Sequence, residues 1–263
     1  MHLAGVILLL TTSVLHAEED LPDRHLVQPR IFNGKTISLR ALGGYAVQIY
    51  KELKFVCTGT LLSKNFILTA AHCMVGDFGD YHVVSGETEQ MPSMFREDRN
   101  YVHKGVRHPD FDKYAFIADI AVLKVREPIR GRDTGYMNIC SHLMSAGDMV
   151  TVSGWGSSEK QKNGNVLRTM LIPLIAKPEC NEEIGRKLPV NVICASNYMR
   201  STLCNGDSGG PMIHKGEVCG VSTWTYECGN NIKPDLFMSV YVYRDFINKA
   251  MDKFSKEANL DWE

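Results

Sequence analysis

The chain has 263 residues, enough for about two ordinary domains or for one large β architecture. Hydrophobic residues make up 44% and charged residues 22%, as in a globular protein that buries a sizeable core. The net charge of −1 gives no electrostatic attraction to nucleic acid or to an anionic membrane, so neither is expected as a partner.

The first 17 residues read as a secretory signal peptide. An apolar run from Leu3 to Leu15 ends near the small residue Ala17, and it is too short to span a bilayer. A short buried helix is the alternative. Secretion places the eight cysteines in an oxidising compartment, where an even number favours disulfides. The sequence contains no Cys-x-x-Cys spacing, so a zinc ribbon is not expected.

Residues 18–30 are polar, and we expect them to be poorly ordered. Arg30, a basic residue, is followed by the apolar Ile31, as at a proteolytic processing site. The chain beyond shows short apolar runs broken by turn residues, the pattern of an all-β sandwich or barrel. The expected strands are Ala46–Tyr50, Gly59–Leu62, Phe66–Ala70, Tyr81–Val84, Ala121–Val125, Val150–Val152, Val166–Leu174, Pro211–His214 and Val218–Thr223.

Near the end of the chain the spacing of the apolar residues changes. Apolar residues recur at helical spacing between charged ones, which predicts an amphipathic helix over about 243–256 packed by its apolar face. The polar, turn-rich stretch Pro128–Asp133 is the candidate linker between two halves.

Three local contexts together indicate nucleophilic catalysis. Ser208 lies in Gly206-Asp207-Ser208-Gly209-Gly210-Pro211, where glycines allow a backbone that presents the hydroxyl beside N–H groups. A serine needs a base and the base an orienting acid; His72 in Thr-Ala-Ala-His-Cys and Asp119 before the apolar run Ile-Ala-Val-Leu supply them. Taken singly, each has a structural reading: a surface turn, a half-buried histidine and a turn aspartate.

These motifs, in the order His, Asp, Ser, resemble the chymotrypsin–trypsin family of secreted serine endopeptidases, over Ile31 to about Ala250. Gly154-Trp155-Gly156 and His108-Pro109 also look like landmarks of that family. The resemblance implies a protease domain over 31–263, all-β, with two packed six-stranded antiparallel barrels at about 31–130 and 134–242 and a C-terminal helix. His72 and Asp119 would come from the first barrel and Ser208 from the second.

The resemblance also implies the mechanism. Ser208 would attack the scissile carbonyl, His72 would move the proton, and Asp119 would orient His72. The backbone N–H groups of Gly206 and Ser208 would form the oxyanion hole.

Activation is implied in the same way. Residues 18–30 would be an activation propeptide, and cleavage at Arg30-Ile31 would free an α-amino group. That group would insert and pair with Asp207, a carboxylate that is costly to bury alone.

The family pattern suggests three disulfides, Cys57–Cys73, Cys180–Cys194 and Cys204–Cys228. It leaves Cys140 and Cys219, which we expect to pair with each other; two free buried thiols are the alternative.

Specificity is where the resemblance becomes ambiguous. Thr202 stands at the pocket base where trypsins carry Asp, and Leu203 would add apolar lining. The wall reads Thr223-Trp224-Thr225, and a side chain at Thr225 should narrow the entrance. Asp235 stands where most relatives have Gly and would attract a basic side chain. We expect a restricted pocket for small P1 residues, and a pocket for Lys or Arg is the alternative.

The expected partners are a protein or peptide substrate, an activating protease and a protein inhibitor; no cofactor is expected. Glu87 and Glu97 stand where calcium-binding relatives place two carboxylates, a weak indication because a calcium site needs six or more oxygens. The alternative function is a catalytically inactive homologue that acts as a binding or regulatory cofactor.

Overall fold

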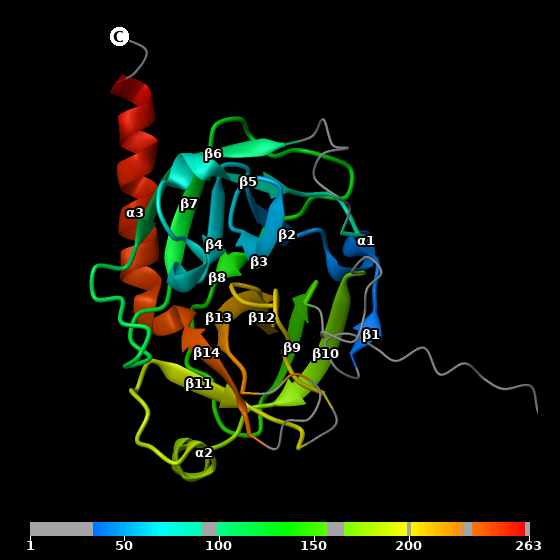
Figure 1. The fold of residues 1–263 in the computed structure, drawn as a ribbon, viewed down its shortest axis with the longest axis vertical. Coiled ribbons are helices and arrows are strands. Elements are labelled where there is room, and N and C mark those ends of the chain that lie inside the picture. The colour runs from blue at the N-terminus through cyan, green and yellow to red at the C-terminus, as the bar shows by residue number, and fades with distance from the viewer. Residues whose placement is uncertain are drawn as a thin grey trace, which may run out of the picture.

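The protein folds into two β structures packed against each other, with one long helix along the side (Figure 1). This computed structural model describes residues 34–90, 99–156, 166–198, 201–226, 228 and 233–260. The signal peptide, the propeptide, Arg30, Ile31 and Glu97 lie outside these residues, so the expectations placed on them stay predictions.

The first half is a closed six-stranded antiparallel barrel, in the order β2-β3-β4-β7-β6-β5. Its interior is filled by aliphatic side chains such as Ile49, Ile67 and Val122, which are fully buried. Burial of this apolar surface is the main force that holds the barrel together. Its strands are β2 (Ala46–Lys51), β3 (Lys54–Leu61), β4 (Phe66–Thr69), β5 (Tyr81–Val84), β6 (Asn100–Arg107) and β7 (Ala121–Val125).

The second half is built on one sheet, in the order β1-β10-β9-β12-β13-β14-β11, with β8 pairing in parallel with β13. Six of these strands form the expected antiparallel run from β10 to β11. Its two outer strands are joined by a single bridge, Leu174–Ala195, so this half is less completely closed than the first. The strands are β1 (Lys35–Thr36), β8 (Asn138–Ile139), β9 (Met149–Gly154), β10 (Arg168–Pro173), β11 (Val192–Ala195), β12 (Pro211–His214), β13 (Glu217–Trp224) and β14 (Asp235–Ser239).

Five strands were not predicted. The longest, β6, reads Asn-Tyr-Val-His-Lys-Gly-Val-Arg and has too few apolar residues to stand out from a loop. Its place is fixed by pairing with β5 and β7 instead. Strand β14 is buried along its whole length, including Asp235, so it shows no polar–apolar alternation. The other three are β1, β8 and β11.

The C-terminal helix α3 spans Val240–Leu260, longer at both ends than the expected 243–256. Its buried residues include Ile247 and Phe254. It runs alongside β7, and the Lys124 Nζ donates to the Phe254 carbonyl, 2.7 Å away. The remaining helices are α1 (Leu39–Leu42), α2 (Lys177–Ile184) and two 3₁₀ turns, Ala71–Cys73 and Phe78–Asp80.

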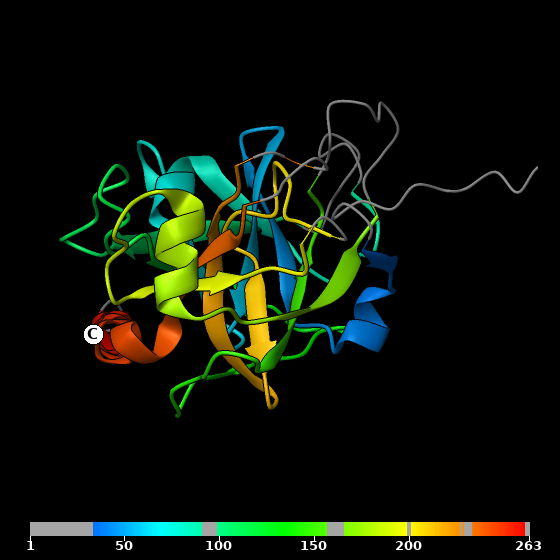
Figure 2. The same cartoon turned by 90° about the horizontal axis from the view of Figure 1, so that it is seen from below.

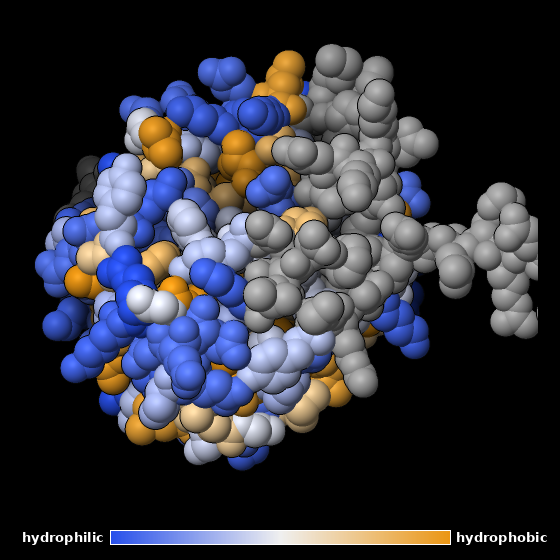
Figure 3. Space-filling model, turned by 60° about the horizontal axis from the view of Figure 1, so that its bottom comes forward, coloured by the Kyte–Doolittle hydropathy of each residue, from blue (hydrophilic) through white to orange (hydrophobic). Residues whose placement is uncertain are grey.

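The helices lie at the periphery, as the view from below shows (Figure 2). Among the described residues, no helix combines the length and the apolar composition needed to cross a membrane. On the face drawn in Figure 3, hydrophobic residues are scattered among hydrophilic ones and do not form one broad patch.

Four disulfides join the described cysteines: Cys57–Cys73, Cys140–Cys219, Cys180–Cys194 and Cys204–Cys228. The first lies beside His72. The second links the end of β8 to β13, and its cysteines are 79 residues apart in sequence.

Candidate active site

His72 and Asp119 form a tight pair. The His72 ring Nδ1 lies 2.6 Å from Asp119 Oδ2, and the His72 backbone N–H donates to Asp119 Oδ1 at 2.8 Å. His72 sits in a 3₁₀ turn directly after β4, and Asp119 lies just before β7, the strand that pairs with β4. Because both oxygens of the carboxylate are engaged, the ring is held in one orientation with Nε2 directed away from Asp119.

The loop that carries Ser208 is pinned from both halves of the molecule. From the first barrel, the Thr58 N–H donates to the Ser208 carbonyl and the Thr58 hydroxyl to the Gly206 carbonyl, both at 2.9 Å. From the second half, the Gly209 N–H donates to the Ser222 carbonyl at 2.7 Å. A Cβ on Gly209, whose φ is +79°, would lie 2.1 Å from the Thr69 hydroxyl, so no side chain fits there.

Two backbone donors of this loop remain available. The N–H groups of Asp207, Gly209 and Gly210 all donate to carbonyls. Within the described chain, the N–H groups of Gly206 and Ser208 take no such partner. A pair of uncommitted donors beside a serine hydroxyl suits an oxyanion.

One cavity of about 230 Å³ brings the predicted residues together. Among the residues that line it, seven were singled out from sequence: His72, Asp119, Cys204, Ser208, Thr223, Trp224 and Thr225. Four others were missed: Lys113, Phe116, Asn205 and Met238. Lys113 and Phe116 belong to the loop between β6 and Asp119, which carries no motif, and Met238 reads simply as an apolar strand residue.

Asp207 is fully buried behind this loop. Its carboxylate accepts from the Gly156 N–H at 2.8 Å and from the Cys204 N–H at 2.9 Å. Burial raises the pKa of Asp207 to about 7, and the two backbone donors only partly oppose this. A Cβ on Gly154 or Gly156 would lie 2.1 or 2.3 Å from its oxygens, so these two glycines make the space for the carboxylate.

Asp235 lies beneath the cavity and does not line it. Its carboxylate accepts from the Thr202 hydroxyl at 2.8 Å and from the Leu203 N–H at 2.9 Å. Burial raises the pKa of Asp235 to about 6, opposed by the Leu203 N–H and by the hydroxyls of Thr225 and Thr202. The Leu203 side chain packs in the core of the second sheet, away from the cavity.

The hydroxyls of Thr202 and Thr225 lie 3.1 Å apart above Asp235. Thr225 lines the cavity, but Thr202, which the sequence placed at the pocket base, does not, and Asp235 is 3% exposed. Glu87 is part of the described chain, but its expected calcium partner Glu97 is not, so the pair stays a prediction.

The sequence model of the trypsin family matches residues 31–247. The chain belongs to the trypsin family. Its four disulfides, its β architecture with a C-terminal helix and its site between the halves fit that membership.

Curated trypsin-family relatives align over most of the chain. Seminase of Drosophila melanogaster is 28% identical over 228 residues, which cover 85% of this chain and 82% of that protein. Trypsin-1 of Salmo salar is 27% identical, covering 82% of this chain and 92% of its own length. Human kallikrein-5 is 26% identical, covering 84% and 76%.

The solved structure of mouse neuropsin has the same fold. It superposes with a TM-score of 0.73 at 23% identity, over 83% of this chain and 98% of neuropsin. The chymotrypsin-like architecture expected from the sequence is thereby confirmed.

Proposed function

We propose that this trypsin-family protein is a secreted serine endopeptidase that uses Ser208, His72 and Asp119. The observation that carries the proposal is the cavity in which all three residues meet, with His72 held by both oxygens of Asp119. Trypsin-family relatives, which are serine endopeptidases, support the reaction class.

The chemistry follows from this geometry. Asp119 holds the proton on His72 Nδ1, so Nε2 is left to accept the Ser208 hydroxyl proton. Ser208 Oγ then bonds to the carbonyl carbon, and the N–H groups of Gly206 and Ser208 receive the negative oxygen. His72 returns the proton to the departing amine, and water hydrolyses the acyl-enzyme by the same steps in reverse.

Activation is proposed through Asp207. Cleavage between Arg30 and Ile31 would create an ammonium group able to pair with this buried carboxylate. The pKa of Asp207 is raised because its carboxylate is buried and, among the described residues, accepts hydrogen bonds only from the Gly156 and Cys204 N–H groups. A cation there would lower the pKa of Asp207 and favour the charged form. Because Asp207 precedes Ser208, such pairing would order the oxyanion hole.

The pocket geometry favours a small, uncharged P1 residue. Thr225 lines the cavity, and its hydroxyl lies 3.1 Å from that of Thr202, which also donates to Asp235. Asp235, the feature that suggested a basic P1 residue, is buried. Its carboxylate accepts hydrogen bonds from the Thr202 hydroxyl, the Leu203 N–H and the Thr225 hydroxyl. A lysine or arginine would have to displace those donors to reach it, at the cost of leaving polar groups unpaired.

Active-site labelling tests the enzymatic function. Protein cleaved after Arg30 should react covalently with a fluorophosphonate probe and hydrolyse a peptide library, and Ser208→Ala should abolish both. The matched control is Ser141→Ala, a serine outside the cavity, which should label normally. If cleaved protein failed to label, an inactive homologue acting as a binding or regulatory cofactor would be the better description.

A P1-scanning library tests the pocket. We expect the parent to prefer Ala, Val or Thr at P1. Thr225→Gly should open the floor and raise the relative rate for Lys, whereas Thr225→Gly combined with Asp235→Asn should not. A parent that prefers Lys or Arg would contradict the narrow-pocket proposal and leave the endopeptidase function intact.

A further inference from the structure

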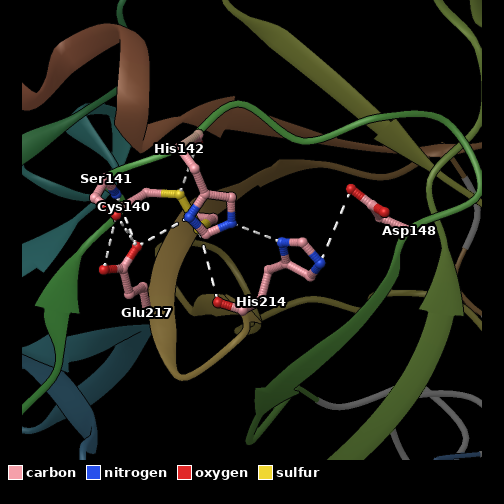
Figure 4. Close-up of polar contacts among 7 residues, drawn as sticks. Cys140, Ser141, His142, Asp148, His214 and Glu217 are labelled. Carbon is pink, nitrogen blue, oxygen red and sulfur yellow. Dashed lines mark hydrogen bonds and ion pairs between the residues drawn. A yellow bond between two sulfur atoms is a disulfide. The ribbon is translucent and has the colours of Figure 1, made fainter.

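A second cluster of titratable side chains lies outside the catalytic cavity, beside the Cys140–Cys219 disulfide (Figure 4). Four side chains form a row in the order Glu217, His142, His214, Asp148. None of them lines the catalytic cavity, and the proposed peptidase mechanism uses none of them.

The row comes from two segments that the fold brings together. His142 and Asp148 belong to the loop between β8 and β9, whereas His214 ends β12 and Glu217 begins β13. Strands β12 and β13 are joined by a tight turn, with Lys215 and Gly216 at φ values of +48° and +79°. The parallel pairing of β8 with β13 places Glu217 opposite Asn138 and brings the loop against this hairpin.

Each histidine has one ring nitrogen near a carboxylate. His142 Nδ1 lies 3.2 Å from Glu217 Oε2, and His214 Nε2 lies 3.9 Å from Asp148 Oδ2. Both carboxylates are fixed by backbone donors: the Ser141 N–H donates to Glu217 and the Ser145 N–H to Asp148, each at 2.8 Å. A carboxylate beside one ring nitrogen favours the tautomer with its proton on that nitrogen.

The inner nitrogens then face each other. His142 Nε2 and His214 Nδ1 are 2.9 Å apart, and Figure 4 shows the two rings directed at one another. With both protons on the outer nitrogens, two lone pairs meet across this gap. A proton on either inner nitrogen turns this contact into a direct N–H···N hydrogen bond, and a metal cation bound by both lone pairs is the other stable arrangement.

We propose that His142 Nε2 and His214 Nδ1 bind a zinc ion, with Glu217 and Asp148 as the outer carboxylates. Imidazole nitrogen is a preferred zinc ligand, and zinc-binding histidines almost always present their other nitrogen to a carboxylate or carbonyl. Here His142 does so at 3.2 Å, whereas His214 Nε2 faces Asp148 at 3.9 Å, beyond hydrogen-bond distance. The arrangement needs no contribution from Cys140 or Cys219, which are bonded to each other.

The fit requires a small opening of the gap. Two Zn–N bonds of about 2.05 Å at the tetrahedral angle place the nitrogens about 3.3 Å apart, so they must separate by about 0.4 Å. The His142 side chain is 29% exposed, which gives the ion a route in and lets water complete the coordination. The ion would join the β8–β9 loop to the β12–β13 hairpin.

Titration calorimetry with zinc chloride tests the proposal on full-length protein carrying Ser208→Ala, which removes self-cleavage. We expect saturable binding of one zinc ion and a rise in melting temperature. Magnesium should give neither effect, because it prefers oxygen ligands. His142→Asn and His214→Asn should each abolish this binding, whereas His103→Gln, at an exposed histidine outside the cluster, should leave it unchanged.

Glu217→Gln gives a second readout if a histidine variant folds poorly. It keeps an oxygen for the Ser141 N–H, yet it should weaken zinc binding by about 10–100-fold, the usual effect of losing an outer carboxylate. Equal zinc affinity in the parent and in both histidine variants would overturn the proposal. So would a parent that binds no zinc, and a direct N–H···N hydrogen bond would then join the two rings.

Discussion

His82 makes the stability of the first barrel depend on pH. The side chain lies on β5, is 2% exposed and stacks on Tyr50 with ring centroids 5.1 Å apart. Its Nε2 has no hydrogen-bond partner in the described part of the chain. Burial, and secondarily the positive charge of Arg99, lower the pKa of His82 from 6.5 to about 4.

The sign and size of the effect follow from linkage. Because the folded protein binds this proton less readily than the unfolded chain, the contribution of His82 is fully present above pH 6.5 and is lost as the pH falls toward 4. With these two pKa values, acidification from pH 7 to pH 5 costs about 2 kcal/mol of unfolding free energy. His82→Phe keeps the stacking on Tyr50 and removes the titrating group, so it should remove this loss.

Urea unfolding of Ser208→Ala protein, followed by tryptophan fluorescence at pH 7 and pH 5, measures the effect. The quantity to compare is the change between the two pH values in the parent and in His82→Phe. Comparison is needed because the raised pKa values of Asp207 and Asp235 act in the opposite direction, adding stability as the pH falls. The exposed His103→Gln is the control. The same pH dependence with and without His82 would refute the reasoning.

Two further predictions concern the scaffold of the site. Gly156→Ala should lower the free energy of unfolding by about 1–3 kcal/mol and reduce peptidase activity, because its Cβ would press on the Asp207 carboxylate. The control is Gly131→Ala, where the nearest atom to a new Cβ is 3.1 Å away and the loss of stability should be small. Equal losses of stability in urea unfolding of the two variants would contradict this reasoning. Cys140→Ser with Cys219→Ser should cost about 2–4 kcal/mol of unfolding free energy, since the bond closes a long loop, while kcat on peptides stays unchanged. An unaltered urea midpoint would show that this disulfide contributes nothing.

The residues that meet at the site could be found from sequence where their local pattern is itself unusual. An acid before an apolar strand, a histidine among small residues and a serine among glycines each have a structural reading alone, but together and in this order they indicate one chemistry. Lys113 and Met238 carry no such signal. They reach the cavity only through the path of a loop and the placement of β14.

The specificity pocket shows a second limit of prediction from the sequence. From sequence, Thr225 and Asp235 gave opposite indications, and their local context ranked a narrowed pocket only slightly ahead of a pocket for a basic P1 residue. The P1 preference that we propose rests on a hydrogen bond between residues 33 positions apart, Thr202 to Asp235, and on the contact between the Thr202 and Thr225 hydroxyls. Likewise, β6 is a strand because β5 and β7 offer it partners, which a local pattern does not encode.

The hydrogen bonds from Thr58 to the loop around Ser208 make the conformation of that loop depend on how the first barrel is aligned with the second half. A hinge movement between the halves would stretch the contacts from Thr58 to the Gly206 and Ser208 carbonyls. The peptide units that carry those carbonyls also set the direction of the neighbouring N–H groups. A ligand that held the halves apart at a distance would therefore slow the proposed reaction without touching His72, Asp119 or Ser208, and one that held them together would speed it.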